Sequence, residues 1–219
     1  MLMRVATFDI DGTLTLGHGW YCIASLLGRL EEYRRTTSLF RRNKVDENTH
    51  LRNLLNLAAG VERVRMDRIL EHLPLIDNIG EGVQVLKKAG IRPLLLTHNP
   101  PYVCEWYIRR FGFDGFLCAE QPVVAGIIQR ADDARAGKAD WIGRYCRRER
   151  LPLSQVIHAG DSASDIAVFE VTGGGVAVNT NSRKAIRAAD AAVNTTDMMD
   201  IVSRMMEISE RLELFKQVR

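Results

Sequence analysis

The sequence predicts an α/β fold in which a parallel sheet carries helices on both faces. Short apolar strands alternate with amphipathic helices along most of the 219 residues, and short loops join them. A helical stretch over residues 17–73 interrupts this alternation directly after the first strand. We therefore expect a sheet domain, residues 1–15 and 77–219, with a small helical domain, residues 16–76, inserted after its first strand.

Residues 4–10 form a β-branched and aromatic run that predicts the first, buried strand. Apolar residues at three- and four-residue spacing predict several helices within residues 17–73. Gly60 and Pro74 punctuate these helices. The remaining elements are a helix over 81–90, a strand over 91–97, a helix over 100–112, a strand over 113–119, a hairpin over 122–130 that turns at Ala125-Gly126, a helix over 137–149, a strand over 154–161, a helix over 164–171, a strand over 173–178, a helix over 182–189, a strand over 190–194 and a final helix to the C-terminus.

The composition is ordinary for a folded soluble protein, with 46% hydrophobic and 26% charged residues. No apolar run approaches the ~20 residues that span a bilayer, and the N-terminus resembles a strand more than a signal peptide. We expect a cytoplasmic protein without a membrane partner. The net charge of +3 is too small to indicate nucleic acid. We interpret the basic run over residues 28–44 as a solvated helix face, with attraction of an anionic substrate as the alternative.

The four cysteines, Cys22, Cys104, Cys118 and Cys146, are widely separated and form no Cys-x-x-Cys pair. This spacing argues against a zinc site and against a thiol-redox motif. We expect reduced thiols in the core. The sequence leaves the oligomeric state open, a homodimer included.

Polar side chains end three of the predicted strands. Asp9 and Asp11 follow the first strand, Thr97 ends the strand over 91–97, and Asp161 ends the strand over 154–161. Open parallel sheets bind ligands at the carboxyl ends of their strands. Neighbouring carboxylates repel each other and are costly to bury without a cation. We therefore predict a hard divalent cation at this edge, and Mg²⁺ suits a site that shares its ligands with phosphate.

This group of residues can support phosphoryl transfer. A carboxylate held beside Mg²⁺ can attack phosphorus and form an aspartyl-phosphate, which water then opens. A second acid two residues further along the loop can give the leaving oxygen its proton. Lys138, at the start of a helix, and the Thr97 hydroxyl can neutralise and orient the phosphoryl oxygens. Gly12 lets the backbone bend tightly, so that nearby N–H groups can face the phosphate.

The segments DIDGTLT, LLLTHN, GKAD and GDSASD resemble, in this order, the four motifs of the haloacid-dehalogenase-like (HAD) phosphatase superfamily. The resemblance implies a Rossmann-like core with the inserted helices as a cap. It also implies a role for each motif residue: Asp9 as nucleophile, Asp11 as general acid and base, Thr97 and Lys138 as phosphate ligands, Asp161 as a metal ligand, Asp165 as its support, and Asp11 as a metal ligand through its backbone carbonyl. Plainer alternatives are a first-turn helix acid for Asp165, a surface lysine for Lys138 and a strand-end hydroxyl for Thr97.

A cap between the first two motifs is similar to the phosphoserine phosphatase branch of this superfamily. That branch usually carries a Glu about nine residues after the nucleophile, where this chain has His18. A neutral imidazole would hold a substrate ammonium poorly, and Glu31 and Glu32 are the nearby acids in the cap. The resemblance offers Arg52 as the ligand of a substrate carboxylate. His98 stands beside Thr97 as a proton donor to the phosphate, and for both His18 and His98 a packed or solvent-facing histidine is the alternative.

The sequence therefore predicts a Mg²⁺-dependent phosphomonoester hydrolase that acts on a small phosphorylated metabolite through an aspartyl-phosphate. Phosphoserine is one candidate substrate. One alternative is a phosphotransferase that passes the phosphoryl group to an acceptor other than water. Another is a non-catalytic module that binds a nucleic acid or a protein through its basic cap. The intact set of carboxylates argues against this alternative.

Overall fold

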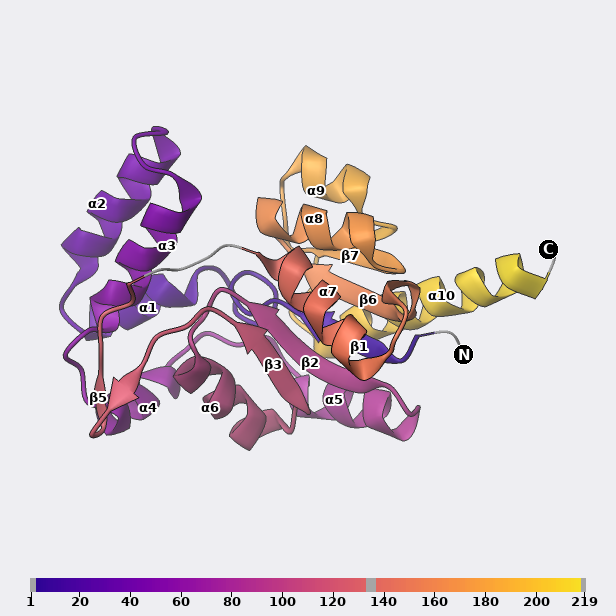
Figure 1. Ribbon diagram of the computed structural model, residues 1–219, viewed down its shortest axis with the longest axis horizontal. Coiled ribbons are helices and arrows are strands. Elements are labelled where there is room, and N and C mark those ends of the chain that lie inside the picture. Colours follow the sequence, from indigo (N-terminus) through magenta and orange to yellow (C-terminus); the bar gives the residue numbers. More distant parts are fainter. Residues whose placement is uncertain (1–2, 133–136, 218–219) are drawn as a thin grey trace.

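The computed structural model describes residues 3–132 and 137–217 of the chain. Within these residues six strands form one sheet in the order β3-β2-β1-β6-β7-β8 (Figure 1). Every neighbouring pair in it is parallel, which confirms the predicted fold class. The strands are β1 (Val5–Phe8), β2 (Arg92–Thr97), β3 (Gly115–Cys118), β6 (Val156–Gly160), β7 (Gly174–Val178) and β8 (Ala191–Val193).

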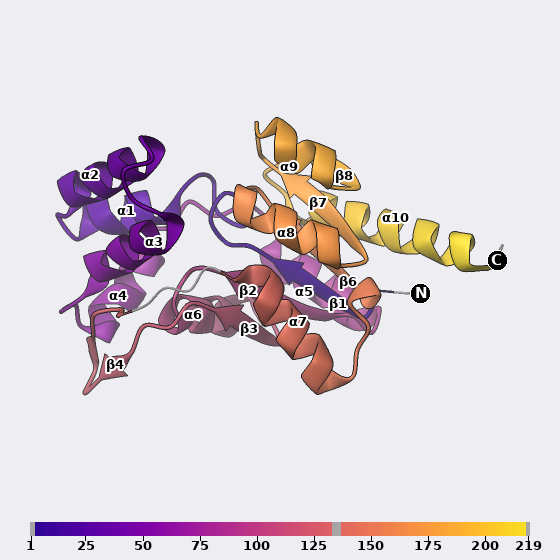
Figure 2. The same ribbon diagram turned by 45° about the horizontal axis from the view of Figure 1, so that its top comes forward.

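Helices cover both faces of the sheet, because the strands carry apolar side chains on both sides. Ala6 and Phe8 of β1 face the larger core, under α5 (Ile79–Lys88), α6 (Pro101–Phe111) and α10 (Met198–Gln217). Val5 faces the smaller core, under α7 (Lys138–Glu149) and α8 (Ala163–Val171). The helix α9 (Arg183–Ala188) packs against α8 and β7 (Figure 2).

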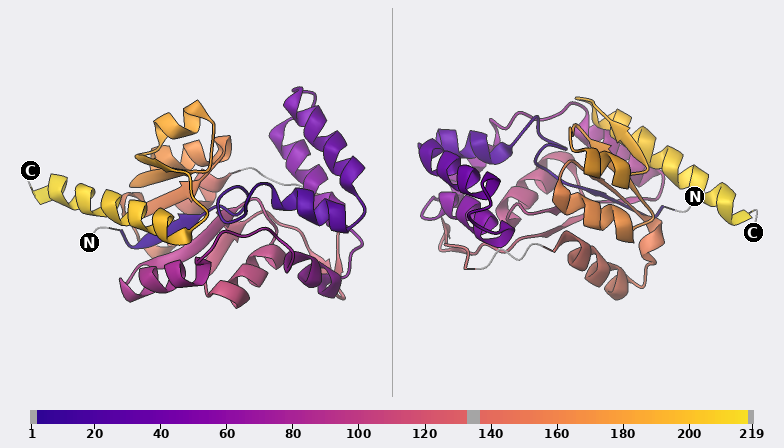
Figure 3. Two further views of the ribbon diagram at one scale, coloured as in Figure 1. Left: turned by 180° about the vertical axis from the view of Figure 1, so that it is seen from behind. Right: turned by 90° about the horizontal axis from the view of Figure 1, so that it is seen from above.

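The interrupting helical stretch forms a group of its own at the carboxyl edge of the sheet. Figures 1 and 3 show these helices at the end of the molecule away from both chain termini. The group consists of α1 (Gly19–Leu26), α2 (Leu30–Arg41), α3 (Glu47–Leu55), a 3-10 turn (Asn56–Ala58) and α4 (Arg63–Leu70). We refer to it below as the cap helices.

Two antiparallel linkers join the cap helices to the sheet. The N–H of Leu16 donates to the carbonyl of Pro74 at 2.7 Å, and the N–H of Ile76 donates to the carbonyl of Leu14 at 3.1 Å. Thr15 and Leu75 form the isolated bridge between these two hydrogen bonds. The chain therefore leaves the sheet and returns to it through one short paired segment.

The predicted hairpin is present as β4 (Val123–Val124) and β5 (Ile127–Ile128). Ala125 and Gly126 both have positive φ, as expected for a tight hairpin turn. The hairpin also pairs with the segment that enters α4, because the N–H of Gly60 donates to the carbonyl of Ile128 at 2.8 Å. The sequence division assigned the hairpin to the sheet domain, but it lies against the cap helices (Figure 1).

Every other predicted element is also present, and within the described residues its ends move by one or two residues. The predicted final helix includes residues 218 and 219, which lie outside the described part of the chain. All four cysteines lie in the described part of the chain and are unbonded, with Cys104 and Cys146 buried and Cys22 and Cys118 half-buried. Among the helices described, none combines the length and the apolar character that a bilayer crossing requires.

Candidate active site

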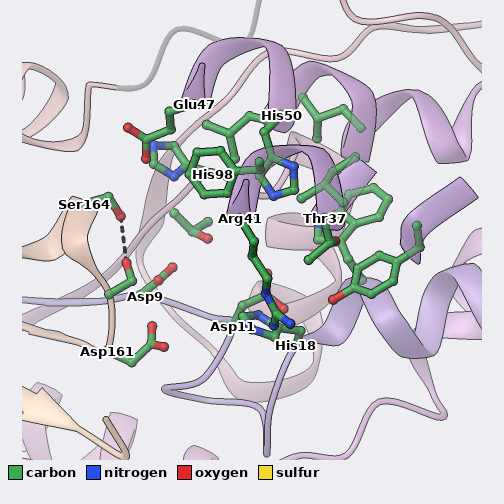
Figure 4. Close-up of a pocket in the computed structure, with 18 residues that line it drawn as sticks. Asp9, Asp11, His18, Thr37, Arg41, Glu47, His50, His98, Asp161 and Ser164 are labelled. Atoms are coloured by element: carbon green, nitrogen blue, oxygen red, sulfur yellow. Dashed lines mark hydrogen bonds between the residues drawn. The ribbon is translucent and has the colours of Figure 1, made fainter. Parts of the chain in front are cut away.

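Three neighbouring strands bring the predicted polar residues to one edge of the sheet. β1 lies between β2 and β6, and Phe8 is in register with Leu95 on one side and Ala159 on the other. Asp9 follows β1, Thr97 ends β2 and Asp161 follows β6. All three line one cavity of about 270 Å³ between the sheet edge and the cap helices (Figure 4).

Asp9 forms a buried ion pair with Lys138. The Lys138 Nζ lies 2.8 Å from Asp9 Oδ2, and the side chains are 1% and 9% exposed. The other oxygen of Asp9 accepts a hydrogen bond of 2.7 Å from the N–H of Ile10. Burial raises the pKa of the Asp9 carboxyl, and the Lys138 ammonium opposes this rise. The lysine thus favours the charged form of Asp9 against the effect of burial.

Lys138 begins α7, a position where helix geometry disfavours a cation. Its ammonium is held there by a second carboxylate, because Nζ also lies 2.7 Å from Asp165 Oδ1. Burial acts to lower the pKa of Lys138, but Asp165 and Asp9 together hold it above its ordinary value. Lys138 is 3% exposed, so it is not a surface lysine.

A buried chain of polar side chains continues behind Lys138. Asp165 Oδ1 lies 2.9 Å from His158 Nε2, and His158 Nδ1 lies 2.9 Å from the Thr7 hydroxyl. Burial acts to raise the pKa of Asp165, but Lys138 and His158 lower it well below its usual range. Asp165 is therefore ionised and can only accept hydrogen bonds. We therefore place a proton on His158 Nε2, which donates it to Asp165 Oδ1. Neither His158 nor Thr7 was predicted, although each is a polar residue inside an otherwise apolar strand.

Asp165 also closes the first turn of α8. Its Oδ2 accepts hydrogen bonds from the N–H of Ser162 at 2.9 Å and from the Ser162 hydroxyl at 2.8 Å. Both oxygens of Asp165 therefore already accept from protein donors. Because both oxygens are already occupied, Asp165 is better suited to orient its neighbours than to bind a metal directly.

The site offers oxygen atoms to a divalent cation. Asp9, Asp161 and Asp165 can each contribute one carboxylate oxygen to a group whose atoms lie within 4.8 Å of one another. Burial raises the pKa of Asp161 to about 8, and the Asp9 charge adds to the rise. A cation between these carboxylates would remove the repulsion, and an all-oxygen donor set fits Mg²⁺. Gly12, at φ +75°, leaves the room that the Asp161 carboxylate occupies, since a side-chain carbon there would collide with it.

The side chain of Asp11 lies outside this acidic group and contacts the cap helices. Its Oδ1 accepts a 2.6 Å hydrogen bond from the N–H of Gly19, the first residue of α1. Its Oδ2 accepts a 2.8 Å hydrogen bond from the Asn99 amide, which also reaches the Thr97 hydroxyl at 3.2 Å. Asp11 therefore connects the end of β2 with the start of the cap. No role for Asn99 was predicted from the sequence, although this residue is part of the second motif, LLLTHN.

His98 lies on the cavity wall as a neutral imidazole. Burial lowers the pKa of His98 to about 3, and the nearby Lys138 ammonium adds to the shift. Its Nε2 is buried and has no hydrogen-bond partner among the described residues. Its ring and that of Trp141 form a T-shaped pair with the centroids 5.6 Å apart. His98 is thus beside the predicted phosphate site, but it carries no charge there at neutral pH.

The wall of the cavity opposite the carboxylates comes from the cap helices and is mainly apolar. Figure 4 shows Arg41, Glu47 and His50 entering the cavity from this side, while Asp9, Asp161 and Ser164 lie at the sheet edge. The apolar members of the wall are Trp20, Tyr33, Phe40, Leu51, Leu54 and Leu55.

Of the predicted cap residues, the cavity includes His18 but not Arg52. The face of α3 toward the cavity carries Glu47, His50 and Leu51, and Arg52 is exposed on another face of the same helix. Arg41, at the end of α2, is the arginine that lines the cavity. The prediction of Arg52 depended on a helical register that the sequence leaves uncertain.

Glu31 and Glu32, the nearby acids that the sequence offers in the cap, are both exposed on α2 and are not among the residues that line the cavity. Glu47, which was not predicted, is the acid that the cap contributes instead.

Comparison of the sequence with known protein families identifies the family that it matches. The sequence matches the haloacid dehalogenase-like hydrolases over residues 6–170, a range that contains Asp9, Thr97, Lys138 and Asp161.

Curated relatives include a phosphoserine phosphatase of Mycobacterium tuberculosis, 25% identical over 196 residues that cover 87% of this chain and 47% of the relative. A phosphoserine phosphatase of Halobacterium salinarum is 24% identical over 216 residues, which cover 94% of this chain and 98% of the relative. The chain spans about half the length of the first of these and of a similar enzyme from Streptomyces coelicolor. A solved substrate-bound phosphoserine phosphatase has the same fold, with a TM-score of 0.78 at 17% identity over 92% of this chain and 98% of that one.

Proposed function

Because the chain belongs to the haloacid dehalogenase-like hydrolase family, we propose that it hydrolyses small phosphomonoesters with Asp9 as the nucleophile. The observation that carries this proposal is the buried contact of 2.8 Å between Lys138 and Asp9. It combines the carboxyl group of Asp9 with a fixed positive charge, next to a group of further carboxylates suited to a divalent cation. An attacking group, a neutralising cation and a metal site are the parts that phosphoryl transfer needs.

The reaction proceeds in two displacements at phosphorus. An oxygen of Asp9 attacks the phosphorus atom, the bond to the leaving oxygen breaks, and that oxygen takes a proton from Asp11. A water molecule then attacks the aspartyl-phosphate and gives its proton to Asp11, and the Asp9 carboxylate leaves with inorganic phosphate released. The amide of Asn99 and the N–H of Gly19 hold the Asp11 carboxyl in one orientation for both proton transfers.

Lys138 and Thr97 bind the transferred group. The Lys138 ammonium is already beside Asp9, so it can donate hydrogen bonds to the phosphoryl oxygens without a rearrangement of charge. The Thr97 hydroxyl, 1% exposed at the end of β2, can donate to a second oxygen. Asp165 orients Lys138 and does not itself react.

We assign the cation to Mg²⁺, held by Asp9, Asp161 and the main-chain carbonyl of Asp11, with Asp165 in support. When bound, it would neutralise the carboxylates and the phosphoryl oxygens at the same time. Asp161 is the ligand with no other role, since no described side chain lies within ion-pair distance of it.

The cap helices bind the leaving group. Residues 16–76 form this cap. The paired linker at residues 14–16 and 74–76 acts as its hinge. Closure of the cap over the sheet edge excludes water from the aspartyl-phosphate. Several relatives are phosphoserine phosphatases, which makes phosphoserine the first substrate to test. His18 stands where that branch uses a Glu, and Arg41 and Glu47 are the charged residues of the cap wall.

The experiment is phosphate release from phosphoserine, a sugar phosphate and a nucleoside monophosphate, each with Mg²⁺ and with a chelator. We expect chelator-sensitive release that Asp9→Asn abolishes. Asp140→Asn, the same change at an exposed position in α7, should retain full release. Consumption of an ester without an equal amount of phosphate would indicate transfer to another acceptor. No consumption of any ester by the folded protein would overturn the proposal.

A further inference from the structure

The surface that the cap presents to the catalytic cavity is mainly apolar. Trp20 comes from α1, Tyr33 and Phe40 come from α2, and Leu51 and Leu54 come from α3. These side chains line the same cavity as the acidic sheet edge. A phosphoryl group bound at the sheet edge would therefore hold its leaving group in one cavity with this wall.

Part of the apolar wall is exposed. Phe40 is 36% exposed, and Leu51 and Leu54 are half-buried. The rings of Phe40 and His50 are stacked in parallel, with their centroids 4.4 Å apart. Burial lowers the pKa of His50, so its ring joins the wall without a charge at neutral pH. Water beside such a surface is unfavourable, and an apolar ligand that covers the surface removes this cost.

The charged residues of the cap wall do not favour either sign of charge in a leaving group. They are Arg41 and Glu47, which carry opposite charges, and both are exposed. Water and salt screen exposed charges, so each of them contributes little to binding. An apolar group therefore gains more from this wall than a charged group does.

The volume of the cavity limits the size of the leaving group. An apolar cavity of about 150 Å³ holds one molecule of benzene. This cavity measures about 270 Å³, which leaves room for a phosphoryl group and one group of about that size. A leaving group of about six to eight carbon atoms would thus fill it.

We propose that the preferred substrate is the phosphomonoester of an uncharged, mainly apolar alcohol of about six to eight carbon atoms. Its carbon skeleton would lie against Phe40, Leu51 and Leu54. This inference rests on the function proposed above and specifies the substrate class of that site. Phosphoserine would be a poorer substrate, because its ammonium and carboxylate would lose water beside an apolar wall.

The same wall also packs the cap, since Trp20, Tyr33 and Leu55 are each at most 9% exposed. Packing alone would make binding independent of the length of the leaving group, so chain length separates the two explanations. The first probes are straight-chain alkylphosphonates of increasing length, which cannot release phosphate by hydrolysis of an ester. Their Kd is measured by titration calorimetry with Mg²⁺.

The second probes are the alkyl phosphates of the same lengths, with phosphoserine beside them, and the measured quantity is kcat/KM for phosphate release. Beyond the shortest members, the leaving alcohols of this series have nearly the same acidity. Differences in kcat/KM along the series therefore report contacts of the alkyl chain and not the reactivity of the ester.

We expect Kd to fall by about threefold for each added methylene up to about six to eight carbons, and then to level off. The kcat/KM of the esters should rise in parallel and exceed that of phosphoserine. Leu54→Asn and Phe40→Asn should each weaken the dependence on length. Leu26→Asn, the same change at an exposed position of α1 that does not line the cavity, should preserve it.

Three results would overturn the inference while the hydrolase function stands: a Kd independent of length, a higher kcat/KM for phosphoserine, or a full length dependence in both variants. Absence of phosphate release from every ester would instead overturn the proposed function. Because Phe40 is partly exposed, Phe40→Asn should fold even where Leu54→Asn does not. A melting temperature close to that of Leu26→Asn verifies this.

Discussion

The ammonium of Lys138 lies 2.8 Å from the carboxylate of Asp9, and neither side chain has more than a tenth of its surface exposed. Such a pair is costly to remove from water, and breaking it leaves a buried charge without compensation. Its retention at the end of β1 is therefore better explained by chemistry than by stability. The pair fixes where the phosphoryl group would bind.

Lys138→Met should reduce kcat by about a hundredfold or more, because the positive charge that meets the phosphoryl oxygens is lost. It should also destabilise the protein by about 3–5 kcal/mol, since Asp9 and Asp165 would remain buried without their partner. Urea denaturation measures the second effect and phosphate release the first. A variant that keeps wild-type kcat would show that Lys138 has only a structural role.

His158→Ala should lower kcat by about ten- to hundredfold, because Asp165 loses a donor and no longer orients Lys138. His158→Gln can still donate to Asp165 and should recover part of the loss. Thr7→Val, which removes only the hydroxyl behind His158, should have the smallest effect of the three. Equal kcat in the Ala and Gln variants, at equal melting temperature, would contradict a positioning role for His158.

Asp161→Asn should separate metal binding from folding. In chelator the variant should melt at or above the wild-type temperature, because one of several mutually repelling carboxylates becomes neutral. Saturating Mg²⁺ should raise the melting temperature of the wild type but not of the variant. Asp140→Asn should respond to Mg²⁺ as the wild type does. An equal Mg²⁺ response in Asp161→Asn would place the metal elsewhere.

His98 should make the protein less stable in acid. Its pKa is about 3 in the folded state and 6.5 as an ordinary histidine, so the unfolded chain binds an extra proton between these values. The free energy of unfolding should thus rise with pH across this window, by up to about 1.4 kcal/mol per unit, and level off above pH 6.5. His98→Asn should flatten the slope, measured by urea denaturation in chelator, and the exposed His72→Asn should not. An unchanged slope in His98→Asn would contradict the burial of an uncharged imidazole.

The sheet and the ends of its strands could be predicted from the sequence, because both depend on local patterns. An apolar run followed by Asp9, or by Thr97, indicates a strand end wherever the rest of the chain lies. The hairpin turn at Ala125-Gly126 is equally local. Its pairing with the segment before α4 joins residues more than sixty positions apart, and no local pattern reports such a contact.

The interior of the site was predicted only in part, because its contacts also join residues that are far apart in the sequence. The motifs supplied Asp9, Asp11, Lys138 and Asp161, whereas the support of Lys138 by His158 depends on one strand and two helices, β6, α8 and α7, meeting in the core. On the cap, the choice between Arg52 and Arg41 depends on the rotation of α3 and the reach of α2. Apolar spacing alone does not determine either quantity.

The central claim is that Asp9 is the nucleophile, and trapping the intermediate tests it most directly. The protein is mixed with Mg²⁺ and its best ester, quenched in acid during turnover, digested and examined by mass spectrometry. We predict one added phosphoryl group on the peptide that contains Asp9, and none in Asp9→Asn. A phosphoryl group on another residue, or wild-type phosphate release by Asp9→Asn, would contradict the account.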